Sequence, residues 1–116
     1  MLVDTHCHLD AARFDTDRAA MMNRAREAGV MRMITIGCDE EYSVRALGLA
    51  ATHADVFASV GVHPHEAEKA SSFFDDVLAP LAQHPRCVAI GECGLDYYYD
   101  HSPRERQREV FARQIA

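Results

Sequence analysis

Four short apolar runs recur along the chain at nearly even intervals. Each is a mostly continuous apolar stretch rather than a strict alternation of apolar and polar residues. Strands that are buried on both faces of a parallel sheet have this pattern. We therefore expect four β-strands, at Leu2–His8, Met31–Gly37, Val56–Val62 and Cys87–Glu92.

The segments between these runs carry apolar residues every three or four positions, as one face of a helix does. Gly29 is a stop signal for the first segment, and Pro80 is expected to kink or split the third. Ser102 followed by Pro103 is expected to begin the last helix, with Ser102 as its N-cap. The expected helices are Thr16–Ala28, Glu41–His53, Ala70–His84 and a final one from Ser102 onwards.

The resulting order, βαβαβαβα, predicts an α/β fold with a parallel sheet and right-handed crossovers. The repeat of roughly 25–30 residues is close to the spacing in a TIM-type (βα)8 barrel, in which about 250 residues form eight units. Four units correspond to the N-terminal half of such a barrel, so we expect residues 1–116 to form a single partial domain. A small open doubly wound sheet is the alternative, although the chain has neither G-x-G-x-x-G nor a Walker A motif.

The composition is that of an ordinary globular domain. The 116 residues include 12 basic and 18 acidic side chains, a formal net charge of -6, with 48% hydrophobic residues. This balance argues against disorder and against broad electrostatic binding of nucleic acid, but not against a nuclease whose metal ions supply local positive charge. No apolar stretch approaches the roughly 20 residues of a membrane span. Without a signal peptide or a C-x-x-C pair, we expect a cytoplasmic protein whose four cysteines are free.

Candidate metal ligands end the first and last apolar runs. His6 and His8 lie on one face of a strand because residues i and i+2 share a face, and imidazole is a good ligand for a divalent metal. Glu92 ends an otherwise apolar strand, where an unpaired carboxylate is costly. In a flat sheet the first and fourth strands would be about 14 Å apart, so one ion can join these three residues only if the sheet is curved. The alternatives are a pair of ordinary polar histidines and an ion pair between Glu92 and an arginine.

Two further histidines follow the third apolar run, at the same carboxyl edge where barrel enzymes carry their active sites. We expect His63 to contact a substrate phosphate and His65 to lie in a loop beside the site, also near substrate. Ordinary surface histidines are the alternative for both.

The segment after the fourth strand is rich in aromatic and charged residues. Tyr97 and Tyr98 are expected to stack on nucleic-acid bases, or else to pack over the barrel mouth. Asp96 is a candidate catalytic base or a residue that supports the ligands, and Arg104 is a candidate phosphate contact. A solvated helix face is the alternative for Arg104, because acidic residues are interleaved with the arginines there.

Several segments together resemble the N-terminal portion of the TatD-type metal-dependent deoxyribonucleases. The resemblance implies a metallo-dependent hydrolase barrel that cleaves phosphodiester bonds of DNA with a metal-activated water, using divalent ions such as Mg²⁺, Mn²⁺ or Zn²⁺. It implies that His6 and His8 bind one metal, that Glu92 bridges two, and that His63 orients the phosphate. The matching segments are Val3–Asp10, Ile36–Asp39, Val60–Pro64 and Gly91–Tyr97, followed by Ser102–Arg104 with Gln107 and Phe111.

Members of this family are about twice as long, as a complete barrel requires. Their later strands supply two further histidines and an aspartate, so the resemblance implies that a C-terminal half is missing here. Without it the first and fourth strands lack partners and the inner face of the half-barrel is exposed, so we expect two half-barrels to associate. Two rival functions stay open at this stage. One is an amidohydrolase-like enzyme that acts on C–N bonds, since the first-strand H-x-H is shared with that wider group. The other is a truncated, catalytically inactive fragment or binding module.

Overall fold

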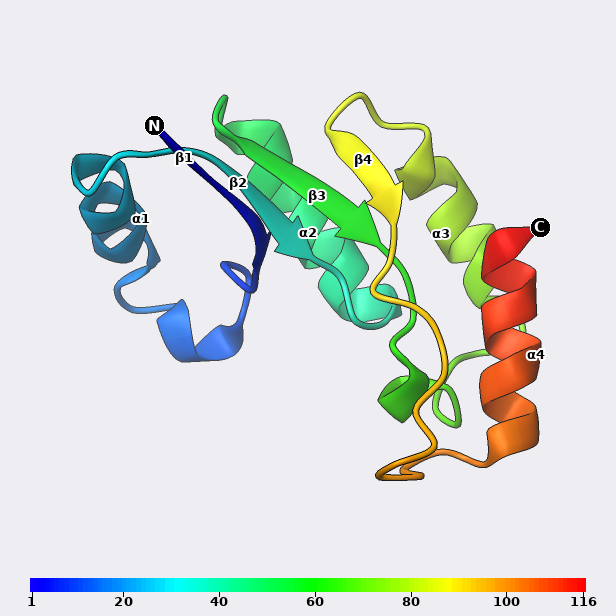
Figure 1. The fold of residues 1–116 in the computed structure, drawn as a ribbon. Coiled ribbons are helices and arrows are strands. Elements are labelled where there is room, and N and C mark those ends of the chain that lie inside the picture. The colour runs from blue at the N-terminus through cyan, green and yellow to red at the C-terminus, as the bar shows by residue number, and fades with distance from the viewer.

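The computed structural model describes all 116 residues and confirms the four expected strands and four expected helices (Figure 1). Two single-turn 3-10 helices, η1 (Ala12–Phe14) and η2 (Pro64–Glu66), follow the first and third strands. The strands are β1 (Leu2–Cys7), β2 (Val30–Ile36), β3 (Val56–Val60) and β4 (Cys87–Ile90). The helices are α1 (Arg18–Glu27), α2 (Glu40–Thr52), α3 (Phe74–Ala82) and α4 (Arg104–Ile115).

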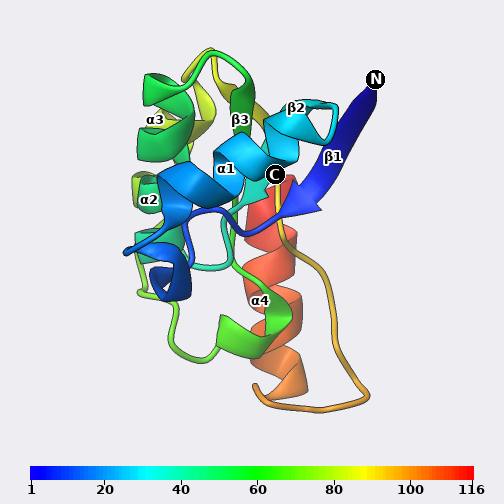
Figure 2. The same cartoon turned by 90° about the vertical axis from the view of Figure 1, so that its left-hand side faces the viewer.

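The strands form one parallel sheet in the order β1-β2-β3-β4. In Figure 1, α2 lies behind β2 and β3, and no helix lies in front of the sheet; Figure 2 shows the same one-sided cover in the turned view. A doubly wound sheet has helices on both faces. The architecture is therefore four βα units of a TIM-type barrel.

The hydrophobic core lies between the sheet and its helices. One cluster joins Met33 and Val56 of the sheet to Met22 of α1 and Leu47 of α2. A second, smaller cluster joins the end of β3 to α3 and α4, through Val60, Phe74, Leu78 and Val110. Because Val56, Ala58 and Val60 face the helices, the alternate residues Phe57 and Ser59 face the uncovered side of the sheet.

Several apolar residues of the sheet and its edges are exposed. β1 and β4 are the edge strands, so each has one row of backbone groups without a strand partner. Leu2, Met31, Val88 and Ile90 are between 45% and 59% exposed, although they belong to or adjoin strands. A surface of this kind is typical of an interface rather than of the outside of a monomer.

Some local expectations need correction. Ser102 is not the N-cap of α4: the helix begins at Arg104, and the Ser102 hydroxyl instead donates to the carbonyl of His65 and accepts the N–H of Glu68. Pro80 does not split α3, which continues from Phe74 to Ala82. Gly29, in contrast, ends the first helical segment as expected, with a φ of 93° that favours glycine. No helix is both long and apolar enough to cross a membrane.

Candidate metal centre

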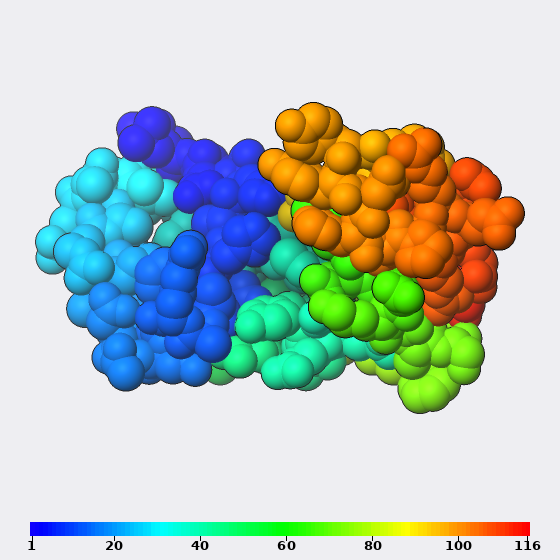
Figure 3. All heavy atoms as spheres, turned by 90° about the horizontal axis from the view of Figure 1, so that it is seen from below, coloured from blue at the N-terminus to red at the C-terminus, as the bar shows by residue number.

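The carboxyl ends of β1 and β4 bring His6, His8 and Glu92 together. One potential ligand atom from each residue lies within 4.8 Å of the others. The Nε2 atom of His6 is 3.5 Å from Oε2 of Glu92. Since β1 and β4 are opposite edges of the sheet, this contact requires a curved sheet, as the sequence argument demanded. Figure 3, seen from the carboxyl ends of the strands, shows the blue residues of β1 beside the orange loop that follows β4.

This donor set fits one divalent ion. Ligands at about 2.0–2.2 Å from a tetrahedral metal are about 3.4 Å apart, close to the observed separation of His6 and Glu92. Two imidazoles and one carboxylate occur together in catalytic zinc sites, where a fourth position stays open for water or substrate. The three side chains are exposed or partly exposed, so both an ion and a substrate can reach them.

Neighbouring groups hold the two histidines in place. The backbone N–H of His6 donates to Oδ1 of Asp4 at 3.1 Å. Nδ1 of His8 lies 3.8 Å from Sγ of Cys38, and Nε2 of His8 has no hydrogen-bond partner in the protein. Burial, and then the charge of Glu92, raise the pKa of Cys38 to about 12, so this group is a neutral thiol at neutral pH. The contact with Cys38 concerns the ring of His8, whereas the bond to Asp4 fixes only the backbone of His6.

His63 presents a hydrogen-bond donor to the same site. Its Nδ1 accepts the backbone N–H of His65 at 3.0 Å, and its Nε2 lies 3.6 Å from Oε1 of Glu92. Burial lowers the pKa of His63, which favours the neutral ring. A neutral ring whose Nδ1 accepts a hydrogen bond carries its proton on Nε2, the atom that faces Glu92.

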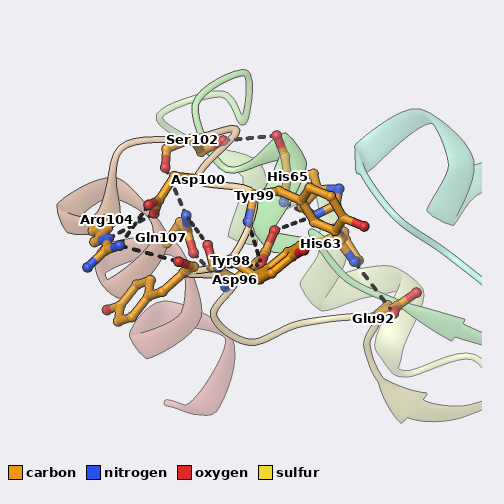
Figure 4. A network of polar contacts seen from close by, with 11 residues as sticks. His63, His65, Glu92, Asp96, Tyr98, Tyr99, Asp100, Ser102, Arg104 and Gln107 are labelled. Carbon is orange, nitrogen blue, oxygen red and sulfur yellow. Dashed lines mark hydrogen bonds and ion pairs between the residues drawn. The ribbon is translucent and has the colours of Figure 1, made fainter.

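Asp96 is fully engaged by its surroundings. Its Oδ2 is 2.5 Å from Nε2 of His65, and its Oδ1 accepts the backbone N–H groups of Tyr98 and Tyr99 at 3.0 and 3.3 Å. Although burial opposes it, these hydrogen bonds hold the pKa of Asp96 below its usual value. The carboxylate therefore organises the loop after β4 (Figure 4), and it lies beside the candidate metal ligands rather than among them.

Two buried polar residues tie this loop to the body of the protein. The side chain of Gln107 accepts the N–H of Asp96 at 2.8 Å and donates to the carbonyls of Asp96 and Ser102 at 3.0 and 2.8 Å (Figure 4). The hydroxyl of Ser102 donates to the carbonyl of His65 in η2 and accepts the N–H of Glu68, just after η2. Both residues are 1% exposed. The sequence marked Gln107 only through the family resemblance, and its local signal for Ser102 pointed to a helix cap rather than to this role.

The remaining candidates for substrate contact have different environments in the structure. Arg104 donates to both carboxylate oxygens of Asp100, at 2.8 and 2.7 Å, and its guanidinium lies 4.6 Å from the centre of the Tyr97 ring. The side chain of Arg104, the first residue of α4, thus lies over the ring of Tyr97. Tyr98, by contrast, is 85% exposed.

Asp10 supports the site, a role that the sequence argument did not identify. It is 3% exposed, and its Oδ1 accepts the hydroxyl of Thr35 at 2.6 Å. The oxygen of the same hydroxyl accepts the N–H of Leu9 at 3.2 Å. These bonds fix the chain just after His8 against β2. A pocket of about 460 Å³ opens here, lined in part by His8, Asp10 and Cys38.

Comparison with known proteins gives a consistent result. The chain is 39% identical, over its whole length, to the uncharacterized metal-dependent hydrolase YabD of Bacillus subtilis, and it covers 46% of that protein. It is 39% identical over 94% of its length to the 3'-5' ssDNA/RNA exonuclease TatD of Rahnella sp., of which it covers 42%. The crystal structure of the TatD homolog YjjV from Escherichia coli superposes with a TM-score of 0.88 at 35% identity, over 98% of this chain and 45% of that one.

The chain therefore spans less than half the length of the curated relatives that it matches. The family model for TatD related DNases matches residues 3–116, which include every segment that carries the resemblance seen in the sequence. The chain belongs to the TatD related DNase family.

Proposed function

We propose that this chain supplies ligands to a metal centre that hydrolyses phosphodiester bonds in nucleic acid, with DNA as the substrate. The observation that carries the proposal is the convergence of His6, His8 and Glu92 from opposite edges of the sheet. A divalent ion bound there supplies Lewis-acid polarisation of a phosphoryl oxygen and a lowered pKa for bound water. A relative named as a 3'-5' ssDNA/RNA exonuclease supports a nucleic acid as the substrate, and the family description, TatD related DNase, supports DNA.

The chain's own residues have separate roles in this proposal. His6, His8 and Glu92 hold the ion. His63 donates its Nε2–H to a phosphate oxygen. Its Nε2 lies 3.6 Å from Oε1 of Glu92, so the N–H faces the place where the ion and its phosphate would lie. Asp96 is a positioning residue rather than a general base, because its oxygens already bind His65 and two backbone amides.

The ligand chemistry limits the choice and number of ions. Two imidazoles and a carboxylate suit Zn²⁺ or Mn²⁺ better than Mg²⁺, which prefers oxygen ligands. Three protein ligands suffice for one open site, whereas a two-metal clamp needs ligands beyond these three. We therefore expect one ion per chain here, and up to two where the later strands of a complete barrel add their side chains.

Residues 1–116 form one partial domain in this proposal. Further barrel units pack against the side of its sheet that carries no helix here. These units come either from the C-terminal half of a barrel or from a second copy of the chain. The exposed apolar residues of β4 and the two free sheet edges support this reading. A cytoplasmic location is consistent with the four free cysteines.

The test compares metal binding and DNA hydrolysis in the same preparations. We expect about one Zn²⁺ or Mn²⁺ per chain, with DNA hydrolysis that is weak because the centre lacks the ligands of the later strands. His6→Ala and Glu92→Gln are expected to lose both, whereas His84→Ala, at the opposite end of the strands, is expected to keep both. Hydrolysis that survives His6→Ala at saturating metal, or a wild-type chain that retains no metal, would refute the proposal.

A further inference from the structure

Two residues connect β3 to His63, and neither has a strand partner. β3 ends at Val60, whose carbonyl accepts the N–H of Gly91 at 2.9 Å. Gly61 and Val62 continue the chain, and none of their backbone groups bonds to a strand. Val62 is 1% exposed, so water cannot take the place of the missing partners, and unpaired backbone groups there would be costly.

Side chains from two helices occupy the positions that strands would otherwise fill. The hydroxyl of Ser43, in α2, accepts the N–H of Gly61 at 3.0 Å and donates to the carbonyl of the same residue at 3.2 Å. The carboxamide of Gln114, in α4, accepts the N–H of Val62 at 2.8 Å and donates to the carbonyl of Val62 at 3.2 Å. Each side chain therefore bonds both polar backbone groups of one residue, as a parallel neighbouring strand does.

The carboxamide of Gln114 is held in one orientation by these contacts. Its Nε2 also donates to the carbonyl of Val110, one turn earlier in α4, at 3.3 Å. Both N–H groups and the oxygen of the carboxamide are thus engaged. Gln114 is 52 positions from Val62 along the chain, so no local pattern in the sequence marks the contact.

The next residue after Val62 is His63, and the backbone there is held as well. The N–H of His63 donates to the carbonyl of Cys38 at 2.7 Å, and Nδ1 of its ring accepts the N–H of His65 at 3.0 Å. Only Nε2 of the ring is left to face Glu92, at 3.6 Å. The direction of Nε2 therefore depends on where the backbone between Val62 and His65 lies.

We propose that Gln114 is a positioning residue for His63, because its carboxamide holds Val62 in the line of β3 and so directs the Nε2–H of His63 into the metal centre. This inference rests on the proposed function, in which that N–H donates to a phosphate oxygen. A displacement of about 1 Å in such a contact can lower a rate about 100-fold. Helix α4 thereby acts on the site without contacting substrate or metal.

Three variants separate the hydrogen bonds of Gln114 from its packing. Gln114→Met keeps the length of the side chain and removes its three hydrogen bonds. Gln114→Glu keeps an acceptor for the N–H of Val62 but places a charged oxygen against the carbonyls of Val62 and Val110. Gln83→Met is the matched control, since Gln83 is exposed at the C-terminal end of α3.

The first measurement is NMR spectroscopy of the full chain labelled with nitrogen isotope. An N–H···N hydrogen bond transmits a coupling between its two nitrogen nuclei, so the bond from His65 to Nδ1 of His63 reports the ring directly. We expect this coupling in the wild type and in Gln83→Met, and its loss in Gln114→Met and Gln114→Glu. Zn²⁺ affinity should stay within about twofold in all of them, because His6, His8 and Glu92 are unchanged.

The second measurement is a double-mutant cycle with His63→Gln. The reaction is hydrolysis of bis(p-nitrophenyl) phosphate, a simple phosphodiester, by the Zn²⁺-loaded chain. Gln114→Met should lower kcat about 10- to 100-fold in the wild-type background. It should have no further effect in the His63→Gln background, because Gln114 acts through His63. A residue that only stabilises the fold would lower kcat by the same factor in both backgrounds.

An undiminished coupling in Gln114→Met, or equal losses of kcat in the two backgrounds, would overturn the inference. The proposed function fails separately. A wild-type chain that binds no Zn²⁺ or hydrolyses no phosphodiester would reject the proposed function, while the coupling between His65 and His63 would still decide whether Gln114 sets the position of the ring.

Discussion

Gly61 marks the closest approach between the ends of β3 and β4. A Cβ atom at this position would lie 2.7 Å from the carbonyl carbon of Gly91 and 2.9 Å from Oε1 of Gln114. Ordinary van der Waals contact begins at 3.4 Å, so Gly61→Ala must displace the backbone of Gly91 by several tenths of an ångström. Because Glu92 follows directly, the substitution should move a proposed metal ligand as well as strain the fold.

The expected cost follows from the rigidity of the groups involved. Overpacking typically costs 1–3 kcal/mol, and the upper half applies here because backbone atoms must give way. We expect Gly61→Ala to lower the free energy of unfolding by about 2–3 kcal/mol. Gly48→Ala is the matched control, since Gly48 lies inside α2 with nothing within 4 Å of the added carbon. Alanine is favoured over glycine there by about 0.5–1 kcal/mol, so the same substitution should stabilise.

Urea unfolding followed by circular dichroism measures both effects. With a slope of about 1.5 kcal/mol per molar urea, the midpoint should fall by about 1.3–2 M in Gly61→Ala and rise by about 0.5 M in Gly48→Ala. Zn²⁺ affinity should fall in Gly61→Ala alone. An unchanged midpoint in Gly61→Ala, or a lower midpoint with undiminished metal affinity, would refute the link between strand packing and the position of Glu92.

Three further predictions concern other parts of the molecule. Arg26 donates to both oxygens of Asp55 and so holds the pKa of that carboxyl below its usual range. The stability it contributes is therefore present above about pH 4 and lost as the pH falls further. Asp55→Asn should lower the free energy of unfolding by about 0.5–1 kcal/mol at neutral pH, and by progressively less as the pH falls below about 4, as urea midpoints across pH will show. Gln107→Leu removes three hydrogen bonds from the loop after β4. Amide exchange at residues 96–102 should then become about tenfold faster or more, and unchanged exchange would contradict the role of Gln107 as an anchor. Light scattering should give a mass above the 13.0 kDa of one chain, because the sheet edges pair between copies; a monodisperse monomer would count against that association.

The candidate metal ligands could be proposed from local pattern alone. His6 and His8 share a strand face because of the two-residue period of a strand, and Glu92 is a carboxylate at the end of an apolar run. What the sequence left conditional was the curvature of the sheet, on which their convergence depended. The structure resolves that condition with the 3.5 Å approach of His6 to Glu92.

Partner choice over long distances could not be predicted. Ser102 precedes a proline as an N-cap residue often does, but its hydroxyl is used by His65 and Glu68, which are 37 and 34 positions away. Arg104 has the chemistry of a phosphate ligand, yet Asp100 on the preceding turn occupies it. A tertiary contact decided the use of Ser102, whereas a local ion pair, four residues apart, decided that of Arg104.

We propose that His6, His8 and Glu92 bind one ion together. Anomalous diffraction from a crystal grown with Zn²⁺ would show this directly. We expect a single strong peak with a nitrogen of each histidine and an oxygen of Glu92 at about 2.0–2.2 Å. A zinc ion bound elsewhere, or one held by the two histidines with Glu92 turned away, would contradict it.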